Sequence, residues 1–268
     1  MDRNSNTPKG YQMKVSSPYV RCIAKTIIDL EEIQGFLDSE GEVWKKTSGS
    51  SGHDDLIEFS GRICYMSFGK RQSPRSNKEY LRNLINSGHG SVLEHVCWTF
   101  VAVGVSRGFT HQLVRHRAGF SYSQLSQQYY DESDANFVAP PSLKIGTSLY
   151  KKWMDAMHSS LKLYRELIAS AKELSISDSL SNKERMRELR TTARSILPNA
   201  IETKIVFTAN ARAIRNFLIA RGAIEGDWEM RDVSCQILNL VKADAPSLFQ
   251  DFEIGFLEDG SKSVIKKF

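Results

Sequence analysis

Residues 115–129 read Arg-His-Arg-Ala-Gly-Phe-Ser-Tyr-Ser-Gln-Leu-Ser-Gln-Gln-Tyr. Two arginines flank a histidine in this segment, and hydroxyl and amide side chains follow with few apolar residues among them. Guanidinium groups bind phosphate through charge-assisted hydrogen bonds, and hydroxyl and amide groups can pair with the edge of a polar ring. The segment therefore predicts a binding site for a phosphorylated ligand that carries a flat, polar heterocycle.

The residues just before this segment predict a buried strand followed by a helix. Residues 96–105 are largely apolar and favour a strand. Ser106 is a favourable N-cap, so we expect a helix from there to about Arg117, with Arg107, His111 and Arg115 on one face. Such a helix would place the Arg-His-Arg triplet at its C-terminal turn, where the macrodipole favours cations.

The rest of the chain mixes strands and helices without regular alternation. We expect strands at residues 19–28, 136–139 and 202–209, helices at 54–68, from Ser76 onward, at 149–174, 182–196, 210–221 and 228–242, and a hairpin at 252–265 around Asp259-Gly260. This order argues against a doubly wound parallel sheet. We predict an α+β fold, a single domain with a central, mostly antiparallel sheet flanked by long helices. Residues 1–18 would be a flexible N-terminal tail, and residues 19–268 a single catalytic domain.

The composition narrows the class of protein. With 268 residues, 41% of them hydrophobic, the chain can bury a sizeable core. A net charge of +5 is mild for a nucleic-acid-binding protein and suits anionic small molecules. The four cysteines (Cys22, Cys64, Cys97 and Cys235) show no paired spacing, and no apolar run approaches the ~20 residues of a membrane span. We expect a soluble, cytoplasmic protein with reduced thiols, no membrane partner and no nucleic-acid partner.

Five ordered blocks of sequence give the chain a family resemblance. The blocks are residues 87–95, 106–107 with 110–111, 115–126, 194–199, and 210–213 with Arg221. In this order and spacing they resemble the flavin-dependent thymidylate synthases, over roughly residues 55–255. The resemblance implies FAD-dependent reductive methylation of dUMP to dTMP, with methylene-tetrahydrofolate as carbon donor and NADPH as reductant.

The resemblance also implies roles for individual residues. Arg221 and His89 would be catalytic: Arg221 polarises the uracil ring, and His89 lies over the flavin near the reacting carbons. The implied cofactor-binding residues are Ser91, Arg115, His116, Arg117, Gln124, Asn210, Ala211, Arg212 and Asn216. The implied substrate-binding residues are Arg107, Gln112, Leu113, Val114, Arg115, Gln124, Leu125, Ser126, Gln127, Gln128, Arg194 and Arg221. The family forms a homotetramer with shared active sites, to which residues 124–128 would reach from a neighbouring subunit.

Several of these residues also have an ordinary structural interpretation. His89 and His95 flank Glu94, but no further Cys or His has zinc spacing, so we predict no metal site. Arg187, Arg190 and Arg194 recur at helical spacing, and a solvated helix face is the alternative to phosphate binding. No base lies beside Ser126 in the sequence, so we interpret it as a substrate contact rather than a nucleophile.

Two departures from the family pattern leave the substrate open. Eight residues, 118–125, separate Arg117 from Ser126, one more than in the family, and Gln128 stands where the family usually has an arginine. One alternative is therefore flavin-dependent methylation or hydroxymethylation, at carbon 5, of another uracil nucleotide such as UMP. Another is a non-catalytic flavin- or RNA-binding protein on the same fold.

Overall fold

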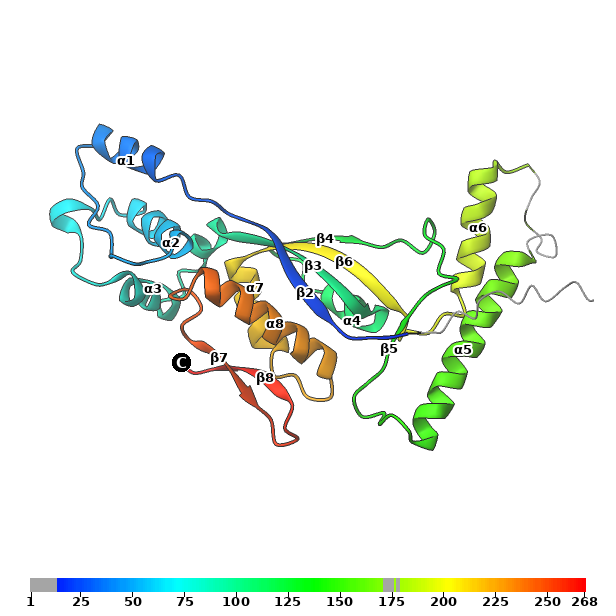
Figure 1. The fold of residues 1–268 in the computed structure, drawn as a ribbon. Coiled ribbons are helices and arrows are strands. Elements are labelled where there is room, and N and C mark those ends of the chain that lie inside the picture. Colours follow the sequence, from blue (N-terminus) through cyan, green and yellow to red (C-terminus); the bar gives the residue numbers. More distant parts are fainter. Residues whose placement is uncertain (1–13, 171–175, 177–178) are drawn as a thin grey trace, which may run out of the picture. The chain divides into compact units, whose positions relative to one another are not determined.

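The computed structural model describes residues 14–170, 176 and 179–268 (Figure 1). Their contacts divide the chain into two compact units. Unit 1 holds the residues up to Pro18, Val103–Gln112 and Gln124–Ile205. Unit 2 holds Tyr19–Ala102, Leu113–Ser123 and Val206–Phe268.

The elements alternate irregularly along the chain, as the sequence predicts. The strands are β1 (Val15–Ser16), β2 (Tyr19–Lys25), β3 (Cys97–Ser106), β4 (Phe120–Gln124), β5 (Phe137–Val138), β6 (Glu202–Asn210), β7 (Phe252–Phe256) and β8 (Lys262–Lys266). The α-helices are α1 (Leu30–Ser39), α2 (Gly52–Ile63), α3 (Asn77–Asn86), α4 (Arg107–Leu113), α5 (Ser148–Ala169), α6 (Asn182–Arg194), α7 (Ala211–Arg221) and α8 (Trp228–Asp244). Two 3-10 helices, η1 (Gly69–Arg71) and η2 (Gly90–His95), lie before and after α3.

The largest sheet has the strand order β2-β3-β6-β4. Backbone hydrogen bonds show that β3 and β6 run in opposite directions: Ala211 N–H donates to the Val96 carbonyl, and Arg107 N–H donates to the Ile201 carbonyl. Strands β7 and β8 also pair antiparallel, while the short strands β1 and β5 pair parallel. The predicted α+β fold with a mostly antiparallel sheet is confirmed.

The core of unit 2 follows from the alternation of side chains along the strands. Trp98 and Phe100 on β3 are completely buried, and the residues that alternate with them, Cys97, Thr99 and Val101, are only partly buried. The ring of Phe100 meets that of Phe207 on β6 with centroids 5.2 Å apart. Helix α8 packs against β2 and β8. Apolar burial of this kind is the main favourable term in folding.

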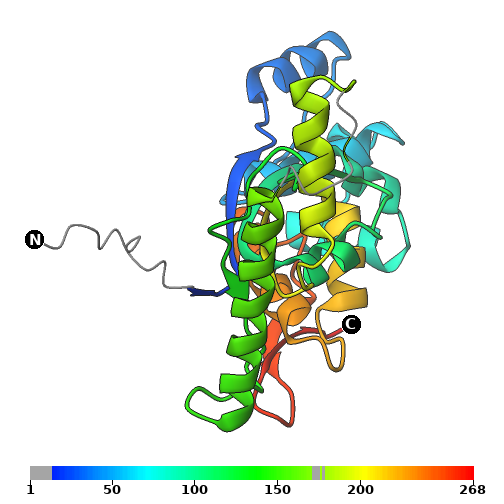
Figure 2. The same cartoon turned by 90° about the vertical axis from the view of Figure 1, so that its right-hand side faces the viewer.

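Unit 1 is built around the pair of helices α5 and α6, which lie side by side in Figures 1 and 2. Its apolar cluster joins α5 to β5 and to residues 197–201, which lie between α6 and β6. It consists of Ala135, Phe137, Met157, Leu161 and Ile201, with Trp153, Met154, Leu197 and Ala200 packed around it. No helix among the described residues combines the length and the apolar composition needed to cross a membrane.

Helix caps occur at several predicted places. Ser76 and Glu79 form a complete capping box at the start of α3. The side chain of Asn210 accepts a hydrogen bond from the Ala213 N–H, and α7 ends at Arg221, as the sequence predicts. The predicted hairpin around Asp259-Gly260 is present as β7 and β8.

Other predictions differ from the structure. Helix α4 ends at Leu113 rather than Arg117, because the chain turns there and the Tyr122 hydroxyl bonds the carbonyls of Leu113 and His116. Arg107 and His111 therefore lie on α4, but Arg115, which was expected on the same helix face, lies beyond the end of the helix. Residues 120–124, expected to be a polar binding segment, form β4.

Three further differences concern the N-terminal half and the helix at 149–174. Helix α1 was not predicted, although Asp29 caps it by accepting from the Glu31 and Glu32 N–H groups. Most of the predicted tail lies outside the described residues, but Val15–Ser16 pairs with Phe137–Val138. Helix α5 ends at Ala169, and residues 171–174 of the predicted helix lie outside the described part of the chain.

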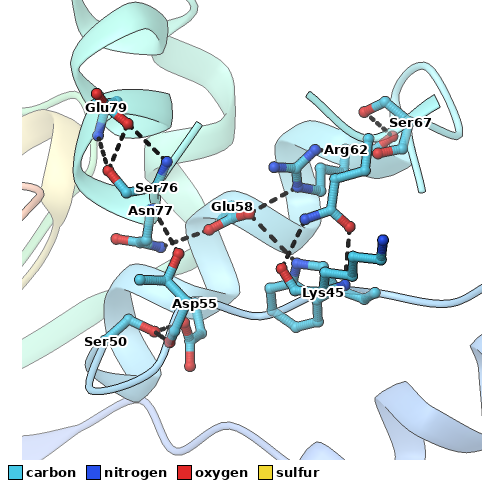
Figure 3. A network of polar contacts seen from close by, with 12 residues as sticks. Lys45, Ser50, Asp55, Glu58, Arg62, Ser67, Ser76, Asn77 and Glu79 are labelled. Atoms are coloured by element: carbon cyan, nitrogen blue, oxygen red, sulfur yellow. Dashed lines mark hydrogen bonds and ion pairs between the residues drawn. The ribbon is translucent and has the colours of Figure 1, made fainter. Parts of the chain in front are cut away.

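A buried polar network fastens α2 to α3 in unit 2 (Figure 3). Glu58 and Arg62 lie one turn apart on α2, each side chain only 1% exposed, and Arg62 Nε donates to Glu58 Oε1 over 2.7 Å. Asn77, at the start of α3, donates to the other carboxylate oxygen over 2.9 Å. The Arg62 guanidinium also stacks on the ring of Tyr80, 4.4 Å from its centroid. Because burying an unpaired charge is costly, these contacts depend on one another.

Replacing Arg62 with Met should destabilise the protein strongly, since the Glu58 carboxylate would remain buried without its cation. We expect the free energy of unfolding, measured by urea denaturation, to fall by about 3–5 kcal/mol. Lys162→Met is the matched control, because it removes the cation of an exposed i,i+4 pair and should cost no more than about 0.5 kcal/mol. Equal losses in the two variants would contradict the importance of the buried pair.

Candidate functional site

The predicted site residues form three groups, each within one unit. The His89 cavity, in unit 2, comprises His89, Ser91, Arg212, Asn216 and their neighbours. The Arg115 turn, also in unit 2, comprises residues 114–119 with Asn210 and Arg221. The Arg194 cluster, in unit 1, comprises Arg107, residues 124–128 and Arg194.

The His89 cavity forms where the chain passes from α3 into η2. Two adjoining hollows of about 210 and 410 Å³ share His89, Gly90 and Arg212 in their walls. Ser91 lines the larger hollow and Asn216 the smaller one. The structure thus brings together four predicted residues from two blocks that lie more than a hundred positions apart in the sequence.

Arg212 approaches the backbone of η2 closely because Gly90 has no side chain. A Cβ atom at Gly90 would lie 2.9 Å from Nε of Arg212, which is closer than real Cβ contacts allow. Arg212 Nη1 also donates to Glu94 Oε1 over 2.7 Å, but both side chains are about half exposed, at 51% and 45%. Water weakens such a pair, so Arg212 can still offer its charge to an anionic ligand.

The lining of the smaller hollow suits a ligand with both apolar and anionic parts. Leu84, Ile85, Leu93 and Ile219 supply apolar wall, and Lys266 from β8 adds a second cation. Arg215 also lines it, but this guanidinium is bound by both carboxylate oxygens of Asp251, at 2.7 and 2.6 Å. Lys266 was missed by sequence reasoning, since it lies in the last hairpin outside every matching block.

In the Arg115 turn, His116 faces Arg221. Arg221 Nε donates to His116 Nε2 over 3.0 Å. Burial lowers the pKa of His116, and the positive charge of Arg221 lowers it further. The imidazole is therefore neutral at neutral pH, with its proton on Nδ1. The resemblance assigns His116 to cofactor binding, and the structure adds this contact with the proposed catalytic arginine.

The turn lies beside the N-terminus of α7. Phe120 N–H donates to the Arg117 carbonyl over 3.1 Å, which closes a β-turn, and Gly119 has a φ of +74°. Asn210 N–H donates to the Gly119 carbonyl over 3.1 Å. A Cβ atom at Gly119 would lie 2.7 Å from Asn210 Nδ2 and 2.8 Å from Ala213 Cβ. Glycine is therefore required here both by conformation and by close contact.

The remaining predicted residues near this turn differ in exposure. Arg115, Arg117 and Gln112 are exposed and can reach a ligand. The side chain of Leu113 is completely buried in the core. Ala211 is also buried, and its N–H is bonded to a backbone carbonyl. Val114 is half-buried.

Two arginines approach each other in the Arg194 cluster. Burial lowers the pKa of Arg107, the Glu132 carboxylate opposes this, and the charge of Arg194 lowers the pKa further. Arg107 Nη1 donates to the Leu125 carbonyl over 3.2 Å. Arginine remains charged in proteins, so Arg107 carries its charge in a partly buried place where the positive charge of Arg194 also acts on it. A phosphate bound here would relieve their repulsion.

The segment from Gln124 to Gln128 is anchored along its length. Gln124 Nε2 donates to Thr110 Oγ1 over 2.8 Å, and Gln128 Nε2 donates to Thr191 Oγ1 over 3.2 Å. The Gln127 side chain is buried. Within the described part of the chain, no histidine, lysine or carboxylate is in hydrogen-bond contact with Ser126. The structure therefore gives this serine no base that would activate it as a nucleophile.

The arginine stripe of α6 faces Tyr129 rather than only solvent. Arg187 donates to the Tyr129 hydroxyl and stacks on its ring, 4.7 Å from the centroid. Arg190 Nη1 donates to the Tyr129 carbonyl over 2.7 Å. Sequence reasoning missed this role of Tyr129, although the residue directly follows the polar segment. The described residues contain no cluster of three His, Cys, Asp or Glu side chains that could hold a metal ion.

Comparison with known proteins gives the same family throughout. A family model described as thymidylate synthase complementing protein matches residues 46–247. A flavin-dependent thymidylate synthase of Mycolicibacterium gilvum (strain PYR-GCK) is 42% identical over 218 residues, which cover 81% of this chain and 86% of that protein. A flavin-dependent thymidylate synthase of Mycobacterium tuberculosis (strain ATCC 25618 / H37Rv) is 39% identical over 244 residues, which cover 91% and 93%.

Replacing Gly119 with Ala should destabilise the protein through both strain and steric overlap. Gly226→Ala is the matched control, because Gly226 has a φ of +72° but nothing lies within 4 Å of its added Cβ. We expect the control to cost about 1–2 kcal/mol, the usual penalty for a left-handed residue. Gly119→Ala should cost clearly more in urea denaturation, and equal losses would show that the contact with Asn210 relaxes freely.

Proposed function

The chain belongs to the flavin-dependent thymidylate synthase family, and from this membership we propose that it converts dUMP to dTMP with FAD, taking the carbon from methylene-tetrahydrofolate and the reducing equivalents from NADPH. The observation that carries the proposal is the convergence of His89, Ser91, Arg212 and Asn216 on one pair of hollows. These residues come from two separate blocks of sequence, and the resemblance assigns all of them to the flavin site.

The His89 cavity fits the cofactor in its chemistry. Arg212 and Lys266 can pair with phosphate oxygens, and the apolar wall can cover a ring. Ser91, Asn216 and His89 supply hydrogen-bonding groups around it. The proposed cofactor-binding set is completed by Arg115, His116, Arg117, Gln124, Asn210 and Ala211. When bound, the flavin supplies the hydride that turns the transferred carbon into a methyl group, and NADPH replaces that hydride.

The nucleotide requires two different actions from the protein. Arg107 and Arg194 would hold the phosphate, because two guanidinium groups there lie near enough to affect each other. Arg221 would act on the base. Carbon 5 of uracil is a weak nucleophile, so a guanidinium at the pyrimidine edge would stabilise the negative charge that develops before the new carbon–carbon bond forms.

We further propose a cytoplasmic homotetramer in which each active site is completed by a neighbouring subunit. The support is the family resemblance, in which residues 124–128 reach across to a neighbour. We also propose that residues 19–268 act as one catalytic domain, since β3, β4 and β6 each contribute residues to both units. Light scattering on the purified protein should give four times the chain mass of 30.3 kDa. A monomer with full activity would contradict the shared site.

Arg221→Ala tests the proposed activity together with the role of this residue. Purified wild-type protein should show flavin absorbance and form dTMP from dUMP, with dUMP-dependent NADPH oxidation. The variant should keep its flavin while turnover falls by about 10²–10³, the usual cost of losing one electrostatic contact in a transition state. A wild-type protein that takes up no FAD would overturn the proposed function. Normal turnover in the variant would show that Arg221 is not the arginine that acts on the base.

Gln128→Arg tests which nucleotide the site prefers. An arginine would add a fixed charge and a planar fork that glutamine lacks. We expect dUMP to bind more tightly to the variant than to the wild type, and the ratio of dUMP to UMP affinity to change, in titrations with both nucleotides. Thr191→Val is the control, since it removes the hydrogen-bond partner of Gln128 without adding charge. Tighter UMP than dUMP binding in the wild type would favour the alternative substrate.

If Gln128→Arg changes neither affinity nor ratio, the side chain does not face the nucleotide. A protein that binds flavin or RNA without turning over either nucleotide would instead fit the non-catalytic alternative. The same titrations, followed by an assay for the methylated product, therefore separate the three functions.

A further inference from the structure

The hydrogen bond between Arg221 and His116 joins two residues that lie far apart in the sequence. Arg221 is in the last turn of α7, and His116 is in the Arg115 turn. Nε of Arg221 donates to Nε2 of His116 over 3.0 Å, within the normal range for such a bond. In the described part of the chain, the two terminal nitrogens of Arg221 have no hydrogen-bond partner and remain available to a ligand.

His116 is itself held from several sides. The Tyr122 hydroxyl lies 2.6 Å from the His116 carbonyl oxygen and 2.9 Å from that of Leu113, which ties the backbone on both sides of the turn. The Phe217 ring meets the imidazole edge-on, with centroids 5.2 Å apart and planes at 79°. The Phe120 ring lies 6.1 Å away. Packing and backbone hydrogen bonds therefore restrict both the position and the rotation of the imidazole.

A neutral imidazole is a suitable partner for a guanidinium that must keep its charge. A carboxylate in the same place would orient Arg221 but would also offset its positive charge. Arg221 would then stabilise a nearby oxyanion less. The lone pair of a neutral histidine accepts the Nε–H bond without adding negative charge. The pair can therefore fix the guanidinium plane and leave its full charge for the ligand.

We propose that His116 is a positioning residue that holds the guanidinium of Arg221 in a fixed orientation toward the uracil ring. This inference rests on the function proposed above, because it assumes that Arg221 acts on the substrate base. The reaction benefits because a charged group that is already oriented need not reorganise as negative charge develops on the ring. His116 acts here through Arg221.

The pair also predicts how activity responds to pH. Among the described residues, Arg221 from α7 bonds the imidazole of His116, Tyr122 from β4 bonds its carbonyl, and Arg115 and Arg117 adjoin it in the sequence. Protonation of His116 would remove the acceptor and place two cations in contact. Because burial and Arg221 lower the pKa of His116, the pair is intact above that lowered pKa and is lost as the pH falls through it. Turnover should therefore decline only at a pH below the ordinary histidine pKa of about 6.5.

Two substitutions separate positioning from other roles. His116→Gln keeps an acceptor near Nε2 but cannot titrate, so it should retain kcat within a few-fold of wild type and lose the acidic decline. His116→Leu removes the acceptor and should lower kcat by about tenfold to 10²-fold, a loss expected from misplacing a catalytic group. Because the resemblance also assigns His116 to cofactor binding, kcat is measured at saturating FAD, and the flavin absorbance of each variant is recorded alongside it. His158→Gln is the control, because His158 is exposed on α5 and its loss should leave the pH profile unaltered.

A double-mutant comparison provides the decisive measurement. In an Arg221→Lys background, which lacks the Nε donor, His116→Leu should have little further effect on kcat, because the two residues act as one unit. Equal losses in the two backgrounds would overturn the proposal, and so would loss of flavin from His116→Leu, which would make His116 mainly a cofactor ligand. Failure of the proposed function would be distinct from these outcomes, since the wild type itself would then form no dTMP.

Discussion

The fold and the proposed site both depend on which group each buried or partly buried arginine contacts, because burying a charge without a partner is costly. Arg62 and Arg215 are buried, and each is bound to a buried carboxylate, of Glu58 and Asp251 respectively. These pairs satisfy charges that could not otherwise be buried. Two arginines of the proposed site have different partners: Arg221 meets a neutral histidine, and Arg107 meets a backbone carbonyl. The first kind of pair stabilises the fold, and the second kind leaves positive charge available for an anionic ligand.

Helix α7 relates the proposed cofactor residues to the proposed catalytic arginine. Asn210 caps its N-terminus, Arg212 and Asn216 line the hollows beside its first turns, and Arg221 lies in its last turn. An α-helix rises 1.5 Å per residue, so the two ends are separated by about 16 Å. One face of this helix is buried through Ile214, Phe217 and Leu218. Because the helix is packed and capped, the distances between these residues are set by its geometry rather than by a loop.

Local signals in the sequence were sufficient for much of this arrangement. The caps at Ser76 and Asn210 depend on hydrogen bonds between residues three positions apart, so they can be recognised without a tertiary structure. The end of α4 could not be, because Tyr122 bonds the carbonyls of Leu113 and His116 only after β4 has formed. The contribution of Lys266 to the His89 cavity likewise requires the last hairpin to be in place. These two failures involve contact between segments that have no recognisable pattern in common, whereas α1 was missed although Asp29 caps it locally.

The two departures from the family pattern fall in different parts of the molecule. Asn210 N–H donates to the Gly119 carbonyl, and Leu125 N–H donates to the Lys204 carbonyl. Each strand advances by the same number of residues between these two bonds, so β4 and β6 pair without a bulge. The extra residue therefore belongs to the β-turn before β4, where Gly119 adopts its left-handed conformation. Beyond that turn β4 pairs with β6, and the following segment is anchored through Gln124 and Gln128. Of the two departures, we therefore expect the exchange of arginine for Gln128 to be the one that bears on nucleotide choice.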